Sequence, residues 1–308
     1  MAGQPLKTRA AALSIASNTA LILIKALAGV VTGSVAILSD AVQSAIDLVA
    51  SVITFFSVRK ADEPADATHQ YGHEKLEDLS AGIEAVLLLV GAAVIALQAI
   101  RRLVEGGHVD TLGVGIGVVA VAATANLLVG GYLTRAARIP DSAALAADGA
   151  HLRTDALVSG GVLVALALVQ VTGAQWIDPV VALLVAAAIC VTGVRILLNA
   201  GRRLIDETLP AEELDPVREV LDSFVGGRIA GYHDLRARHA GSRHEVDLHL
   251  QFAAGTSLEQ AHALAHEVQA AIRARLENTT VLVHLEPQDR IRADRFREAG
   301  ADSRFRAG

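Results

Sequence analysis

The sequence predicts an all-α bundle of six transmembrane helices followed by a small cytoplasmic α+β domain. Hydrophobic residues make up 52% of the 308 residues and the mean hydropathy is +0.43, which is too apolar for an ordinary soluble domain. Long runs of Ala, Val, Leu and Ile occur between residues 10 and 200. After Arg203 the pattern changes to short helical and strand periodicities rich in charge, as in a soluble domain. We therefore expect a membrane domain over residues 1–203 and a cytoplasmic domain over residues 204–290.

Each apolar run is close to the roughly 20 residues that cross the hydrocarbon core of a bilayer. The six predicted spans are residues 10–32, 35–58, 77–103, 112–135, 143–171 and 177–198. Most Lys and Arg residues fall on one side of these spans, which places that side and both termini in the cytoplasm. The first apolar segment is long enough to span, so we interpret it as a membrane helix and not as a signal peptide.

The cytoplasmic domain is predicted to follow the order αββαβ. A proline opens the first helix in "LPAEELDPVREVLDSF", and apolar and polar residues alternate in the strand "RHEVDLHLQF". A serine cap opens the second helix, "SLEQAHALAHEVQAAIRARL", and "TTVLVHLEP" is a final strand. This order favours a ferredoxin-like or heavy-metal-domain fold. Residues 291–308 are rich in Arg without a pattern and are expected to be disordered.

Composition excludes several classes of function. The net charge of −6 and the lack of a basic tract argue against a nucleic-acid partner. Cys190 is the single cysteine, which excludes disulfide frameworks and CxxC zinc sites. A metal site must therefore use His, carboxylate and amide ligands. Neither HExxH nor GxSxG occurs in the sequence, which disfavours a membrane hydrolase.

Two predicted spans carry polar residues that are costly inside a bilayer. Gln43 and Asp47 are four residues apart in the second span, and His151 and Asp155 are four apart in the fifth. Residues at this spacing lie on the same face of a helix. Two such pairs could converge into a four-ligand site for a divalent transition metal, whose charge would offset the buried acids. The alternative is that these residues line a water-filled cavity or join neighbouring helices.

Six segments, in this order, resemble the cation diffusion facilitator family. They are "SNTALILIK", "GSVAILSDAVQSAID", "YGHEKLEDLSAGIEA", "DGAHLRTDALVS", "WIDPVVALLVA" and "VLVHLEP". The family consists of homodimeric six-span exporters that move zinc or related metals against protons. The resemblance implies a transport site at Gln43, Asp47, His151 and Asp155. Because the first position is commonly His or Asp in the family, Gln43 leaves iron(II), manganese, cobalt and cadmium open beside zinc.

The resemblance also implies metal sites outside the membrane. A second site in the loop between spans two and three would use Asp66, His69 and His73, and its alternative is a solvated polar loop. A regulatory two-metal site in the cytoplasmic domain maps onto His233, His249, His262, His284 and Glu286. Its alternative is a hydrated surface rich in histidine. The three remaining histidines of this domain have no assigned role, and the first two of them are expected on the surface: His239, His244 and His266.

Together these features predict a metal/proton antiporter and not an enzyme. Zn²⁺ is the expected substrate and regulatory ligand, and a homodimer in the inner membrane of a bacterium is the expected assembly. A metal-dependent membrane hydrolase, a passive channel and a metal-sensing receptor are the alternatives from other classes. Protons compete with metal for imidazole and carboxylate ligands, so metal loading is expected to weaken as the pH falls.

Overall fold

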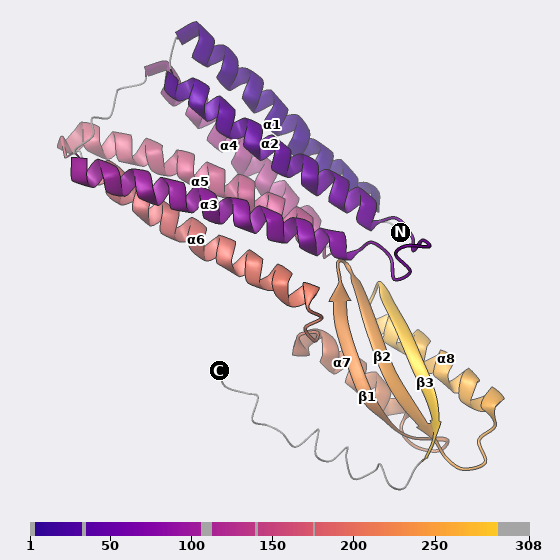
Figure 1. Cartoon of the computed structure of the whole chain (residues 1–308). Helices are drawn as coiled ribbons and strands as arrows, with labels where there is room; N and C mark the ends of the chain where they lie inside the picture. Colours follow the sequence, from indigo (N-terminus) through magenta and orange to yellow (C-terminus); the bar gives the residue numbers. More distant parts are fainter. Residues whose placement is uncertain (1–3, 33–34, 106–112, 139–140, 175, 289–308) are drawn as a thin grey trace. The chain divides into compact units, whose positions relative to one another are not determined.

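The computed structural model describes residues 4–32, 35–105, 113–138, 141–174 and 176–288 (Figure 1). The chain divides into two compact units, Met1–Ile205 and Asp206–Gly308. The change of sequence pattern after Arg203 lies two residues before the end of the first unit. The tail expected to be disordered, residues 291–308, lies outside the described residues.

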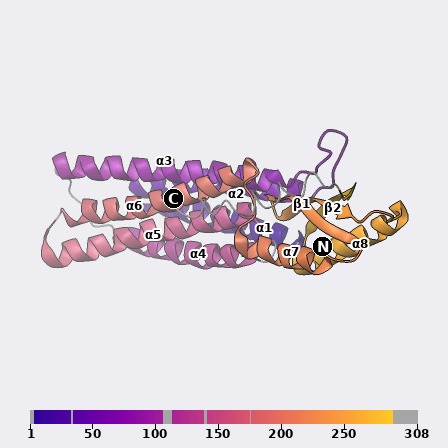
Figure 2. The same cartoon turned by 90° about the horizontal axis from the view of Figure 1, so that it is seen from below.

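The first unit contains six helices within its described residues, and they lie side by side (Figures 1 and 2). The helices are α1 (Gln4–Thr32), α2 (Val35–Ala61), α3 (Lys75–Glu105), α4 (Gly113–Arg138), α5 (Ala143–Thr172) and α6 (Ile177–Leu204). The most extensive packing joins α1 with α2, α3 with α6 and α4 with α5. Several helices are longer than the predicted spans, because helical backbone continues into the polar residues that flank each apolar run.

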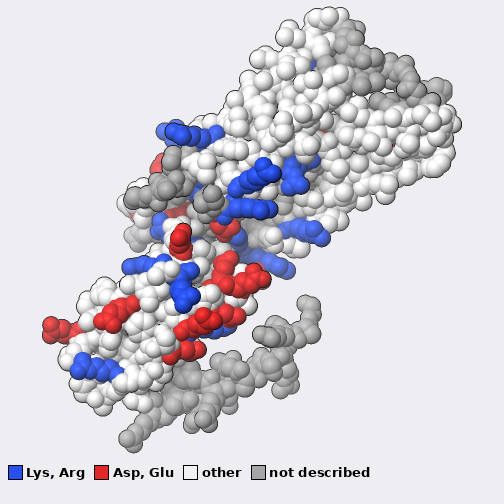
Figure 3. Space-filling view, turned by 180° about the vertical axis from the view of Figure 1, so that it is seen from behind, with Lys and Arg blue, Asp and Glu red and all other residues white. Residues whose placement is uncertain are grey.

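Four of these helices are long and apolar enough to cross a membrane. The qualifying segments are Leu6–Ala28, Lys75–Val104, Ala143–Val169 and Ile177–Leu204. Membrane crossing by α2 and α4 therefore stays a prediction. Helices α2, α4 and α6 each carry two basic residues in their last turn. Lys and Arg gather toward one end of the helical unit in Figure 3, while most of its visible described surface is uncharged.

Helices α4 and α5 approach closely where both carry glycine. A Cβ atom added to Gly149 would lie 2.7 Å from Thr134 Oγ1, 2.9 Å from the Thr134 backbone nitrogen and 3.0 Å from the Gly130 carbonyl oxygen. Small residues allow this close backbone approach between membrane helices.

The second unit consists of α7 (Ala211–Phe224), β1 (Ile229–Ala240), β2 (Arg243–Phe252), α8 (Leu258–Arg275) and β3 (Thr279–Pro287). This order confirms the predicted αββαβ pattern. The sheet has the order β1-β2-β3, in which β1 and β2 are antiparallel and β2 and β3 are parallel. Both helices cover one face of the sheet (Figure 1).

The core of this unit forms between that face of the sheet and the two helices. Val246, Leu248 and Leu250 of β2 are at most 1% exposed and pack against Val217 of α7 and Val268 of α8. The side chains of the odd-numbered residues of β2 therefore point to the opposite face of the sheet. This alternation decides which histidines lie next to the core and which lie on the open face.

We expect Gly149→Ala to destabilise the helical unit, because the added methyl group overlaps α4 and overpacking costs about 1–3 kcal/mol. Gly131→Ala is the matched control, since a Cβ atom there meets nothing within 4 Å. The measurement is the thermal unfolding temperature of the purified protein in detergent, followed by helical circular dichroism. Equal unfolding temperatures for the two variants would contradict the close contact.

Candidate metal sites

Helices α2 and α5 bring three of the predicted transport residues together. His151 Nε2 lies 3.2 Å from Asp47 Oδ1 and 3.7 Å from Asp155 Oδ2. One ligand atom from each of the three side chains lies within 4.8 Å of the others. The side chains of Asp47 and His151 are each 9% exposed, and that of Asp155 is 26% exposed. The side chain of Gln43 lies outside the described part of the structure.

The chemistry of this cluster suits a dication. With all three side chains deprotonated, as metal coordination requires, the two carboxylates and the imidazole would carry a net charge of −2, which a divalent cation balances. His151 and Asp155 face the same way because they are one helical turn apart on α5, while Asp47 reaches them from α2. Oxygen and nitrogen ligands of this kind bind zinc and the neighbouring first-row metals.

Two further acids are buried near this cluster. Glu84 of α3 is 0% exposed and accepts a hydrogen bond from Thr54, while Asp148 is 1% exposed and accepts one from Ser51 at 3.3 Å. Sequence reasoning assigned no role to Glu84. The available signal was an acid within the apolar run of α3, the same signal that singled out Asp47.

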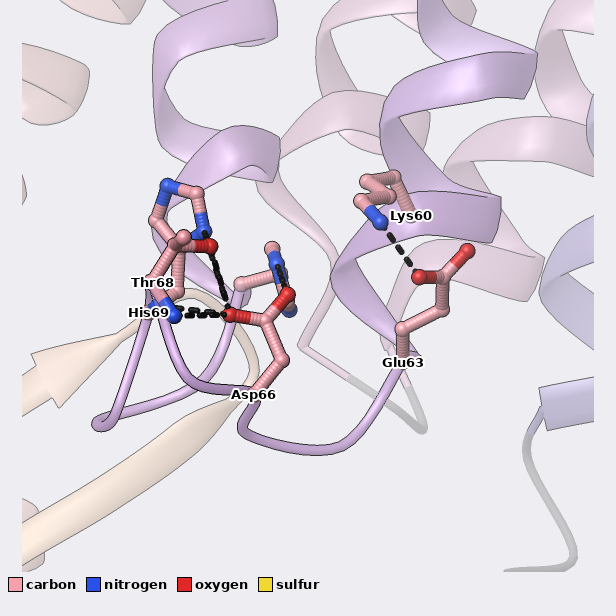
Figure 4. Close-up of polar contacts among 6 residues, drawn as sticks. Lys60, Glu63, Asp66, Thr68 and His69 are labelled. Atoms are coloured by element: carbon pink, nitrogen blue, oxygen red, sulfur yellow. Dashed lines mark hydrogen bonds and ion pairs between the residues drawn. The ribbon is translucent and has the colours of Figure 1, made fainter.

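The loop after α2 brings the second predicted set together, and Figure 4 shows Asp66 and His69 of this set. Asp66 Oδ1 accepts hydrogen bonds of 2.7 Å from the Thr68 hydroxyl and from the backbone N–H groups of Thr68 and His69. These bonds hold the pKa of Asp66 well below its ordinary value, and the bond from the Thr68 hydroxyl contributes most. The carboxylate is therefore ionised near neutral pH.

His73 completes the loop set. Its Nε2 lies 3.3 Å from Asp66 Oδ2, and its ring centroid lies 4.6 Å from that of His69. The His73 side chain is 3% exposed, and neither ring nitrogen has a hydrogen-bond partner among the described residues. A buried imidazole without hydrogen bonds is costly, and a metal ion coordinated by one ring nitrogen would offset part of that cost.

The open face of the sheet carries four of the five residues predicted for the cytoplasmic site. His249 is paired in register with His233 on β1 and with His284 on β3. Glu286 lies 2.7 Å from His233 Nε2 and 2.9 Å from His249 Nδ1, and it lies 3.6 Å from His284 Nε2. The hydrogen bond with His233 is the main cause of a lowered pKa at Glu286, which keeps this ligand ionised.

The fifth predicted residue, His262, lies apart from this group within the single chain. It is exposed on α8, where its Nε2 lies 3.1 Å from that of His266. Helix α8 covers the core face of the sheet, whereas the other four residues lie on the open face. The expectation that His239 lies on the surface is wrong, because this residue is only 7% exposed.

Comparison with known proteins gives matches over almost the entire chain. Residues 11–205 match the cation efflux transmembrane domain, and residues 209–288 match the cytoplasmic domain of cation efflux proteins. An uncharacterized transporter of Synechocystis sp. is 34% identical over 277 residues, covering 90% of this chain and 89% of the relative.

Two further comparisons concern pumps and a solved structure. The cation-efflux pump FieF of Klebsiella pneumoniae is 33% identical over 288 residues, covering 94% of this chain and 95% of the pump. A solved structure of CzrB is 33% identical with a TM-score of 0.25, and the match covers 26% of this chain and 99% of that chain.

We expect Asp66→Asn to weaken zinc binding by the loop roughly tenfold or more, because the variant loses the only anionic ligand of this set. Glu63→Gln is the matched control, since this acid of the same loop forms an ion pair with Lys60 and not with the histidines (Figure 4). Equilibrium dialysis of the purified full-length protein against Zn²⁺ measures the affinity. If both substitutions weakened zinc binding equally, the loop would attract the ion through its net negative charge and not through coordination by Asp66.

Proposed function

The chain belongs to the cation efflux family of membrane transporters, and from this membership we propose that it exports Zn²⁺ or a related dication in exchange for protons. Members of this family are transporters and not enzymes. The hydrolase alternative is therefore set aside.

One observation carries the proposal. Asp47, His151 and Asp155 converge from two helices inside an apolar unit, with three ligand atoms within 4.8 Å of one another. Buried carboxylates are retained in membrane proteins where they serve an ion or proton pathway. In the proposed mechanism the helical unit exposes this cluster alternately to the two sides of the membrane. A dication leaves on one side, and protons occupy the same ligands on the return.

Proton coupling follows from the chemistry of the ligands. Coordination requires a free electron pair on each imidazole or carboxylate, so a proton and a metal ion exclude each other from the same atom. Each cycle would then move metal outward and protons inward without a separate proton pathway. A proton gradient directed into the cytoplasm would in this way drive export of the metal.

The metal itself is proposed from the ligand types. Zinc binds imidazole and carboxylate readily, and it is the first candidate. The amide of Gln43 is neutral and a weaker ligand than imidazole, which brings iron(II), manganese, cobalt and cadmium into consideration. Each of these ions accepts nitrogen and oxygen ligands.

The cytoplasmic unit is proposed to dimerise the transporter and to bind regulatory metal. His233, His249, His284 and Glu286 offer imidazole nitrogens and a carboxylate on adjacent strands, a donor set that suits zinc. Metal bound there would couple to the transport site through the energetic linkage between separate sites.

We expect Asp47→Asn to abolish zinc uptake into proteoliposomes that is driven by an imposed pH gradient, because the variant removes an anionic ligand from the cluster. Asp178→Asn is the matched control, since this buried acid pairs with Arg102 at 2.9 Å and is not part of the cluster. Zinc flux in wild-type vesicles that ignores the pH gradient would indicate a passive channel. The absence of flux in those vesicles would indicate a receptor.

We expect Gln43→His to shift metal preference toward zinc, because an imidazole replaces a neutral amide four residues before Asp47. The measurement is growth of an exporter-deficient bacterium on graded zinc, iron, manganese, cobalt and cadmium. Cells that carry the wild-type chain provide the reference, and Gln43→Asn controls for the loss of side-chain length. An unchanged order of protection in all three strains would remove Gln43 from the selectivity of the site.

A further inference from the structure

The cytoplasmic unit contains another cluster of imidazole and carboxylate groups, which the transport function does not use. Glu213, His239 and His244 each place one ligand atom within 4.8 Å of the others. Their side chains are 36%, 8% and 13% exposed. The cluster is therefore more enclosed than an ordinary group of surface charges.

The local backbone explains why these residues meet. His239 and His244 are paired directly across β1 and β2, next to the turn that joins the two strands. His244 shares the core face of β2 with Val246, so its side chain points toward the helices. Glu213 lies in the first turn of α7, one of the two helices that cover this face. The four residues of the open-face cluster lie on the other side of the same sheet.

The distances fit metal ligands better than hydrogen bonds. Glu213 Oε2 lies 3.4 Å from His239 Nε2 and 3.5 Å from His244 Nε2. A nitrogen–oxygen hydrogen bond is usually about 2.7–3.2 Å long. Ligands about 2.0–2.2 Å from a tetrahedral zinc ion are separated from one another by about 3.3–3.6 Å. Glu213 Oε2 is also buried without a hydrogen-bond partner among the described residues.

A neighbouring carbonyl group sets the orientation of one imidazole. His244 Nδ1 lies 3.1 Å from the backbone carbonyl oxygen of Glu277, which can only accept a hydrogen bond. In the neutral ring Nδ1 therefore carries the proton, and the electron pair of Nε2 faces Glu213. A carboxylate oxygen and an imidazole electron pair that face each other repel unless a proton or a metal cation lies between them. Metal-ligating histidines commonly have this arrangement, with the second nitrogen bound to a carbonyl group.

We propose that Glu213, His239 and His244 form a further divalent-metal site of the zinc type, with three protein ligands and a water molecule in the fourth position. A metal ion there fastens the start of α7 to the turn between β1 and β2. Because the ligands come from three separate elements, the ion stabilises the folded cytoplasmic unit. This site is independent of the transport cluster and of the open-face cluster.

The test is the number of zinc ions bound per chain by the purified full-length protein in detergent, measured by equilibrium dialysis and elemental analysis. We expect the double variant His239→Gln/His244→Gln to bind one zinc ion fewer than the wild type. Glu213→Gln should weaken this ion roughly tenfold or more. Glu212→Gln, an exposed acid of the same helical turn, should leave the number and the affinity unchanged.

Equal zinc binding by wild type, Glu213→Gln and the double variant would overturn the proposal and indicate an ion pair between Glu213 and a protonated histidine. If the double variant does not fold, Glu213→Gln decides the question. Glutamine has nearly the same shape as glutamate, and the side chain at this position is partly exposed, so this variant should fold. Failure of the proposed transport would not affect this result, since the assay counts bound zinc and does not involve Asp47.

Discussion

Acids buried in an apolar helical unit need a compensating positive charge or a hydrogen-bond donor, and this constraint organises the membrane domain. Glu77, which is 1% exposed, lies 2.7 Å from the ammonium group of Lys7. The positive charge that compensates this acid is therefore supplied by the chain itself. Asp47 and Asp155 instead surround the imidazole of His151, a group that can gain or lose its charge. Removing a carboxylate from water costs roughly several kcal/mol, even after the surrounding protein has relaxed. In the proposed function, an exchangeable cation at this position would connect the stability of the unit with transport.

The same pairing of imidazole with carboxylate recurs outside the helical core, and the side chains of these pairs are buried to different extents. In the loop, the backbone around Asp66 holds the carboxylate in place before any ligand binds, and His73 is buried beside it. On the open face of the sheet, Glu286 bridges histidines from adjacent strands. Rigid strands fix ligand positions more strongly than a loop does.

The elements of the fold were largely predictable from sequence, because periodicity and apolar run length are local properties. The αββαβ order and the six helical segments both followed from them. Helix ends were predicted less well, since the backbone of α1 begins at Gln4 and that of α6 continues to Leu204, beyond the apolar residues. The spacing of His151 and Asp155 likewise indicated a shared helix face, whereas their proximity to Asp47 depends on the packing of α2 against α5.

The sequence by itself determined the ligand types, the apolar surroundings and the pairs that share a helix face, because these depend on residue identity and spacing. Only the tertiary structure decided which distant residues meet. It showed that His262 lies apart from the open-face cluster, because α8 covers the opposite face of the sheet. It also brought Glu213 to His239 and His244, because helix packing and strand register combine three segments that no local pattern connects.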